Sequence, residues 1–161
     1  MRYTNVVHED FANYHKPAMF IGTISCDGKC WRELGLPSDT CQNDALRSAY
    51  VREIDTFTLV EKYINNHITE AVVFGGLEPM LQIDEVLEFI YILRNTFNNN
   101  DDVVIYTGYY PDELVYELNE LKKYKNIVVK FGRYIPDDKQ KNDDVLMVTL
   151  SSSNQYAVRI S

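Results

Sequence analysis

Short apolar segments alternate with amphipathic segments along most of this chain, and no other feature restricts the fold as strongly. Four apolar segments have the composition of buried β-strands, at residues 18–25, 71–74, 103–106 and 127–131. Amphipathic helical patterns separate them, at residues 55–66, 83–97 and 111–121. Because parallel strands need such crossover segments, the pattern predicts an α/β protein. We expect an open, mostly parallel sheet with flanking helices, or a small partial (β/α) barrel.

The C-terminal part of the chain departs from this alternation. Residues 135–144 are almost wholly polar, which predicts a solvated loop without chemistry. The apolar stretches 145–150 and 156–160 are then expected as edge strands that close the sheet. A length of 161 residues suits one core, so a single domain over residues 1–161 is predicted.

Charge and hydropathy argue against two classes of partner, nucleic acid and membranes. The formal net charge is -8 and the Lys and Arg residues are scattered, so no basic stripe is available to neutralise nucleic acid phosphates. No run approaches the roughly 20 apolar residues that cross a membrane, and the first residues lack the apolar core of a signal peptide. We therefore expect a soluble cytoplasmic protein that binds neither nucleic acid nor membrane.

Three cysteines, Cys26, Cys30 and Cys41, are the first candidates for chemistry. An odd number without a secretion signal argues against a disulfide framework and favours ligation, catalysis or simple burial. Cys26 and Cys30 follow the first strand, where Asp27 and Gly28 mark a turn. A cubane cluster normally has four cysteine ligands, so three thiolates would leave one iron free for an exogenous ligand.

Two more loops are expected beside these cysteines, because loops that leave the carboxyl ends of parallel strands meet at one edge of the sheet. Residues 75–79 follow the second strand and contain the pair Gly75 and Gly76. Residues 107–109 follow the third strand. A Gly-Gly turn lets the backbone approach a ligand closely, because no Cβ intervenes.

The order of these motifs resembles the radical S-adenosylmethionine enzymes, and within them the anaerobic ribonucleotide reductase activating proteins. The resemblance runs nearly end to end and is carried by residues 9–13, Cys26 and Cys30, residues 41–43, 75–79, 106–109 and 152–155. Two departures stand out. Ten residues separate Cys30 from Cys41 where the family has two, and Leu77 is inserted into the family's Gly-Gly-Glu-Pro turn.

The resemblance implies a radical enzyme with a 4Fe-4S cluster on Cys26, Cys30 and Cys41. It implies that S-adenosylmethionine is cleaved reductively at this cluster, and that the 5'-deoxyadenosyl radical takes a hydrogen atom from a backbone glycine of a partner. The expected partner is a glycyl radical enzyme, the large subunit of the anaerobic ribonucleotide reductase, and the expected reductant is flavodoxin-like. The residues it implies for cofactor binding are Gly75, Gly76, Glu78, Pro79, Thr107 and Gly108.

Two alternatives remain open. The chain could activate another glycyl radical enzyme or act as another small radical enzyme of the same type. It could also be a non-catalytic interaction domain in which the cysteines bind zinc, with His8 or His15 as the fourth ligand.

Overall fold

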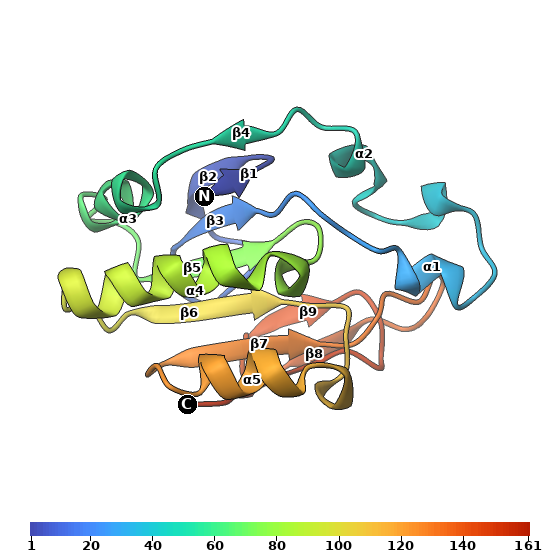
Figure 1. The fold of residues 1–161 in the computed structure, drawn as a ribbon. Coiled ribbons are helices and arrows are strands. Elements are labelled where there is room, and N and C mark those ends of the chain that lie inside the picture. The colour runs from blue at the N-terminus through green and yellow to red at the C-terminus, as the bar shows by residue number, and fades with distance from the viewer.

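The main feature of the fold is a six-stranded, mostly parallel open sheet. The computed structural model describes residues 1–161. Across the sheet the strands are β10 (Tyr156–Arg159), β7 (Ile127–Phe131), β6 (Asp102–Tyr106), β5 (Ala71–Gly75), β3 (Ala18–Gly22) and β2 (Val6–Asp10). The four central strands are parallel (Figure 1), and β2 and β10 pair with them as antiparallel edges. The α/β prediction is confirmed, and the sheet is open.

The four expected central strands are all present, and their composition explains why. Strands β5 and β7 are buried at every position, as expected for strands covered on both faces. The first strand ends at Gly22 rather than at Ser25, because the next residues leave the sheet to form the loop that carries Cys26. The register sets Gly22 beside Gly75, and Tyr106 beside Lys130, at the carboxyl edge of the sheet.

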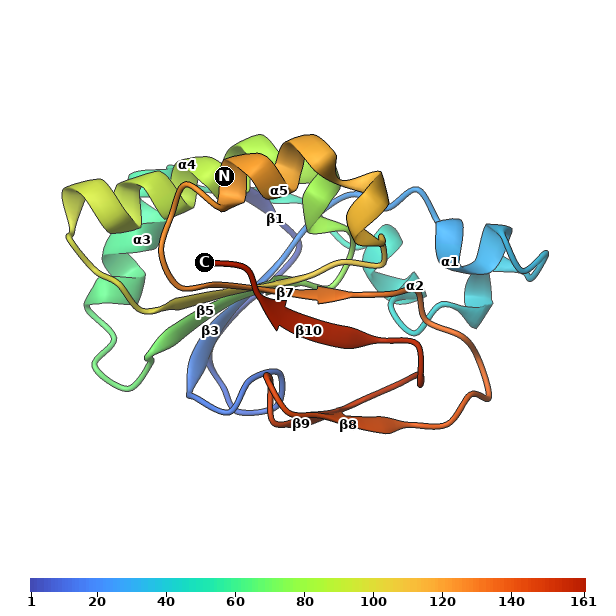
Figure 2. The same cartoon turned by 90° about the horizontal axis from the view of Figure 1, so that it is seen from below.

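Three crossover helices cover one face of the sheet, as Figure 2 shows. They are α3 (Thr56–Ile64), α4 (Ile83–Tyr91) and α5 (Val115–Leu121). Successive parallel strands are added in one direction, so right-handed crossovers place all three helices on the same side. The Asp55 carboxylate caps α3 by accepting from Thr58 N at 2.9 Å. No helix here has both the length and the apolar composition needed to cross a bilayer.

Short helical turns and strands complete the chain. The helical turns are α1 (Lys29–Arg32), η1 (Ser38–Thr40), α2 (Asp44–Arg47), η2 (Pro79–Gln82), the π-turn η3 (Ile92–Thr96) and η4 (Pro111–Glu113). The short strands are β1 (Arg2–Tyr3) and β4 (Arg52–Glu53), which pair with each other, and β8 (Lys141–Asp143) and β9 (Val148–Leu150), which form a hairpin.

The sheet separates two apolar cores of unequal size. The larger core lies under the helices and contains Phe74, Phe89 and Leu121. The smaller core lies on the opposite face, where Leu146 and Leu150 of the β8–β9 hairpin pack on Val104 and its neighbours (Figure 2). Burial on both faces accounts for the uninterrupted apolar runs of the central strands.

Two expectations for the C-terminal part are wrong. Residues 145–150 do not form an edge strand of the main sheet, and the polar stretch 135–144 is not all loop, because β8 pairs with β9 in a separate hairpin. The Asp143 carboxylate explains the turn: its Oδ1 accepts from Val145 N at 3.0 Å and from Leu146 N at 2.9 Å. Only the second stretch, β10, closes the main sheet.

Asp102 joins three segments at the amino end of β6, and this predicts an acid-sensitive component of stability. Its carboxylate accepts from Tyr14 Oη at 3.0 Å, Lys16 Nζ at 2.6 Å and Arg159 Nη1 at 2.7 Å. Burial alone would raise the pKa of Asp102, but the hydrogen bonds from Arg159, Lys16 and Tyr14 outweigh it and lower this pKa. The stabilisation is therefore complete above the unfolded pKa of about 3.9 and is lost as the pH falls further.

We expect Asp102→Asn to lower the free energy of unfolding by about 2 kcal/mol at pH 7, and by much less near pH 2. Urea unfolding of both proteins across this range measures the difference. A difference that stays constant with pH would contradict the assignment to the ionised carboxylate.

Candidate metal centre

Hydrogen bonds join the loops after β3 and β5 at the carboxyl edge of the sheet. Thr23 donates to the Gly75 carbonyl twice, from its backbone N at 2.9 Å and from Oγ1 at 3.1 Å. Further along, Glu78 N donates to the Ser25 carbonyl at 2.7 Å. The segment that leads into Cys26 is therefore fixed against the Gly-Gly turn, as the convergence of parallel strands predicts.

Glu78 joins the loop after β5 to the loop after β6. Its buried carboxylate accepts from Thr107 Oγ1 at 2.7 Å and Met80 N at 3.1 Å on Oε1, and from Gly108 N at 2.9 Å on Oε2. Burial raises the pKa of Glu78 to about 7, although these three hydrogen bonds act in the opposite direction. Three expected site residues, Glu78, Thr107 and Gly108, are thus in direct contact.

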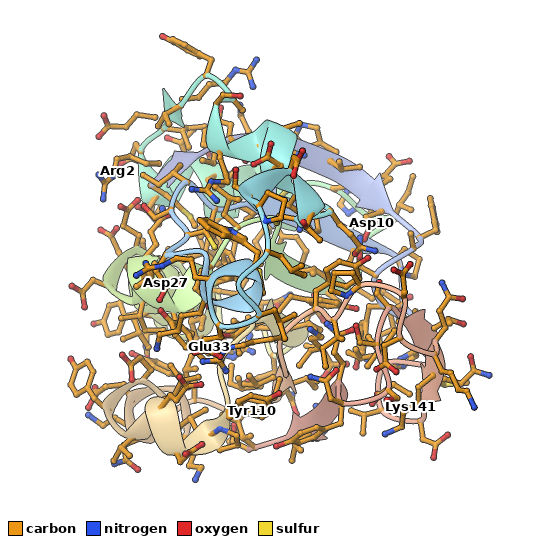
Figure 3. The ribbon with its side chains drawn as sticks, turned by 90° about the vertical axis from the view of Figure 1, so that its right-hand side faces the viewer. Arg2, Asp10, Asp27, Glu33, Tyr110 and Lys141 are labelled. Carbon is orange, nitrogen blue, oxygen red and sulfur yellow. The ribbon has the colours of Figure 1, made fainter.

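The three cysteines lie just beyond this edge and all line one cavity of about 460 Å³. Cys26 precedes α1 and its Sγ accepts from Gly28 N at 3.3 Å. Cys30 lies in α1, and Cys41 follows η1. All three are free thiols of intermediate exposure. Figure 3 looks onto this end of the molecule, where Asp27 and Glu33 mark the loop of the first two cysteines and Tyr110 marks the loop after β6.

Cys30 and Cys41 lie close enough to affect each other's ionisation in spite of the ten residues between them. A hydrogen bond from Cys30 lowers the pKa of the Cys41 thiol to about 6, with further contributions from Asn43 N and the Arg47 guanidinium. The same hydrogen bond and burial raise the pKa of Cys30. Burial is the main cause that raises the pKa of Cys26. Cys41 is therefore the thiol closest to the thiolate form that metals require.

The donor set fits a cluster better than it fits a single ion. No group of three His, Cys, Asp or Glu side chains is arranged to hold one metal ion, and His8 and His15 are exposed and do not line the cavity. Neither histidine is therefore in position to be the fourth ligand of a zinc ion bound by the cysteines. A cubane does not need convergence on a single point, because each thiolate binds a different iron. All three cysteines line the same cavity, which is compatible with this mode of binding.

Four of the six residues expected to bind the cofactor line the cavity, namely Gly76, Glu78, Thr107 and Gly108. Gly76 has φ +80°, a conformation that glycine adopts without strain, and a Cβ there would lie 3.1 Å from Leu46 Cδ1. Gly75 and Pro79 are buried and are not part of the lining. Gly75 accepts the Thr23 bonds, and Pro79 begins the turn η2. The inserted Leu77 lines the cavity as well.

The cavity extends from the cysteines over the sheet face that the β8–β9 hairpin covers, and sequence reasoning missed this part. Its walls include Phe20 and Tyr106 from the sheet, residues 148–151 from the hairpin region, and Lys130. Burial lowers the pKa of Lys130 to about 8, although Glu78 and Cys30 favour its charged form. The sequence feature that could have indicated this part of the cavity is the single lysine inside the otherwise apolar strand 127–131.

Comparison with known families supports an iron-sulfur protein. A family model described as a 4Fe-4S single cluster domain matches residues 36–158. The matched region contains Cys41 and the loops after β5 and β6, and it begins after Cys26 and Cys30. Searches of the curated proteins and of the solved structures find no match. Since the match covers more than half of the residues, the chain belongs to the 4Fe-4S single cluster domain family.

Proposed function

We propose that this protein is a radical S-adenosylmethionine enzyme that activates a glycyl radical enzyme. The observation that carries the proposal is the meeting of Cys26, Cys30 and Cys41 with the Gly76 turn around one cavity. Its volume of about 460 Å³ is in the range of small-molecule sites, roughly 300–1,000 Å³. When bound, a cluster with one open iron supplies an electron that cleaves the sulfonium into methionine and a 5'-deoxyadenosyl group able to take a hydrogen atom from glycine.

The chain's own residues would hold the cluster, orient the ligand and release the protons of the thiols. Cys26, Cys30 and Cys41 would ligate iron as thiolates, so binding releases the protons that these thiols hold in the free protein. Gly76 lets the backbone approach the amino acid part of the ligand closely. Glu78 keeps the loops after β5 and β6 at a fixed distance from each other through its bonds to Thr107 and Gly108.

A protein substrate suits this arrangement, and we propose the large subunit of the anaerobic ribonucleotide reductase as that substrate. The resemblance in motif order supports this choice of partner. A flavodoxin-like protein would supply the electron.

Anaerobic reconstitution with iron and sulfide, followed by reduction and addition of S-adenosylmethionine, tests the enzymatic proposal. We expect 5'-deoxyadenosine and methionine in equal amounts. A complete cluster that yields neither product would refute the radical activity. The partner is tested next by mixing with glycyl radical enzymes, the anaerobic ribonucleotide reductase among them, and recording electron paramagnetic resonance spectra. A glycyl radical signal only with a different enzyme would refute the choice of partner.

A further inference from the structure

The segment that carries Cys30 and Cys41 has no buried residue. Every residue from Lys29 to Asp55 is partly or fully exposed, and the turns α1, η1 and α2 contain no buried side chain. Figure 1 shows α1 and α2 beyond the carboxyl ends of the strands, outside the layer of crossover helices. A segment with little apolar burial opens easily, because burial is the main force that fixes it. The position of α1 therefore depends on its polar contacts.

Those contacts lead to one group of charged residues. Residues 29–50 make side-chain hydrogen bonds or ion pairs with residues outside 26–50 at three positions, Lys29, Glu33 and Gln42. Lys29 begins α1, and its Nζ donates to Glu113 Oε1 at 3.0 Å. Glu33 ends α1, and its Oε1 accepts from Arg133 Nη2 at 2.9 Å. We call the four charged residues the Arg133 network: Lys29, Glu33, Glu113 and Arg133.

Arg133 is the centre of this network and is only 8% exposed. Its Nη1 and Nη2 donate to the two carboxylate oxygens of Glu113 at 2.9 and 2.7 Å, and its Nε lies 2.8 Å from Glu33 Oε2. Its guanidinium also lies over the Tyr110 ring, and Figure 3 shows Glu33 and Tyr110 near each other at this end of the molecule. Because the planar guanidinium can pair with two carboxylates at once, Arg133 connects α1 to η4.

The charges of the network balance, and they lie next to Cys30 in the sequence. Lys29 directly precedes Cys30, and Glu33 follows it by three residues. The hydrogen bond from Arg133 is the main cause that lowers the pKa of Glu113 to about 2, so this carboxylate is charged at neutral pH. Loss of either Arg133 or Glu33 would leave one charge without a counterpart. Charges and hydrogen bonds around an iron-sulfur cluster affect its reduction potential, since the reduced cluster carries one more negative charge.

We propose that Arg133 positions the cluster-binding segment by pairing with Glu33 and Glu113, which holds α1, and with it Cys30, beside the loop after β6. The inference rests on the cluster and the function proposed above. Arg133 does not line the cavity, so it acts through the segment that it holds and is a positioning residue. An isolated exposed ion pair contributes little, whereas a network around a bidentate arginine contributes measurably.

The first measurement uses the metal-free protein and its single tryptophan, Trp31, which lies in α1. The variants are Arg133→Met, Glu33→Gln and the control Arg159→Met, which breaks an ion pair with Asp102 at the opposite edge of the sheet. We expect Arg133→Met to raise the acrylamide quenching constant of Trp31 about twofold or more, since α1 then opens more often. Glu33→Gln should raise it less, and the control should match the wild type. Circular dichroism verifies that each variant is folded.

The second measurement is a redox titration of the reconstituted proteins, followed by electron paramagnetic resonance. Arg133→Met removes a positive charge, so we expect it to disfavour reduction of the cluster about tenfold, which is about 59 mV for one electron. Glu33→Gln removes a negative charge and should shift the potential in the opposite direction. The control should keep the potential of the wild type, although it loses an ion pair as well.

An unchanged quenching constant or an unchanged potential in Arg133→Met, or an equal change in the control, would overturn the positioning role. If Arg133→Met does not fold, Glu33→Gln decides by the same two measurements, because it alters only an exposed side chain. Failure of the proposed function looks different: the cluster then assembles but does not cleave S-adenosylmethionine, and the comparison between variants still decides the role of Arg133. A wild type that assembles no cluster overturns both.

Discussion

Cys41→Ala is expected to lower the cluster content of the reconstituted protein by more than about tenfold. Even changes in the outer shell of a metal site typically cost ten- to a hundredfold in affinity, and loss of a ligand should cost at least as much. Cys41 lines the cavity with Cys26 and Cys30, and a hydrogen bond from Cys30 lowers the pKa of its thiol. Iron and sulfide analysis, together with the visible absorption of the cluster, measures the effect.

Thr40→Ala is the matched control for this prediction. Thr40 is the last residue of η1, directly before Cys41, and its substitution disturbs the same loop without removing a thiol. We expect its cluster content to equal that of the wild type. A complete 4Fe-4S cluster in Cys41→Ala would remove this residue from the ligand set and would leave the long segment from Trp31 to Thr40 without a metal-binding purpose.

The central part of the fold followed from the sequence because it depends on local patterns. Strands β5 and β7 are apolar throughout and could only be buried, while Asp55 and Pro111 mark helical starts that the structure contains. The C-terminal strands were predicted less well from the sequence. Residues in β8 are polar, and their pairing with β9 depends on a turn fixed by the Asp143 side chain, which no local pattern reveals.

The site divides in the same way. The position of Gly76, Glu78 and Thr107 near the cysteines follows from the rule that parallel strands end at one edge of the sheet. The contact between Cys30 and Cys41 does not follow, because a loop of ten residues can close in many ways. The place of Lys130 in the cavity wall was missed because it depends on which face of β7 the β8–β9 hairpin covers, and no local pattern reveals that.

Glu78→Ala is expected to destabilise the protein by about 3 kcal/mol or more. The substitution leaves Thr107 Oγ1, Gly108 N and Met80 N without their acceptor in a buried position. For a chain of this length, that loss corresponds to a fall in Tm of about 6–12 °C. Glu78→Gln keeps the shape but turns one acceptor into a donor that faces an N–H or O–H, so we expect an intermediate loss of about 1–3 kcal/mol at pH 5. Glu61→Gln, on the exposed side of α3, should change little.

The pH profile separates the charge of Glu78 from its shape. Burial raises its pKa from an ordinary 4.5 to about 7, so between these values the folded protein binds a proton that the unfolded chain does not. Stability from this group is therefore fully present below pH 4.5 and is lost as the pH rises through 7, by about 3 kcal/mol in all. Glu78→Gln lacks this group, so its loss relative to the wild type should be larger at pH 5 than at pH 8. The stability that Asp102 contributes changes with pH in the opposite direction and only below about pH 4. The comparison of denaturant midpoints between pH 5 and 8 therefore reports on Glu78 and not on Asp102. A loss that is the same at pH 5 and pH 8 would show that the Glu78 carboxyl has the same pKa in the folded and unfolded protein.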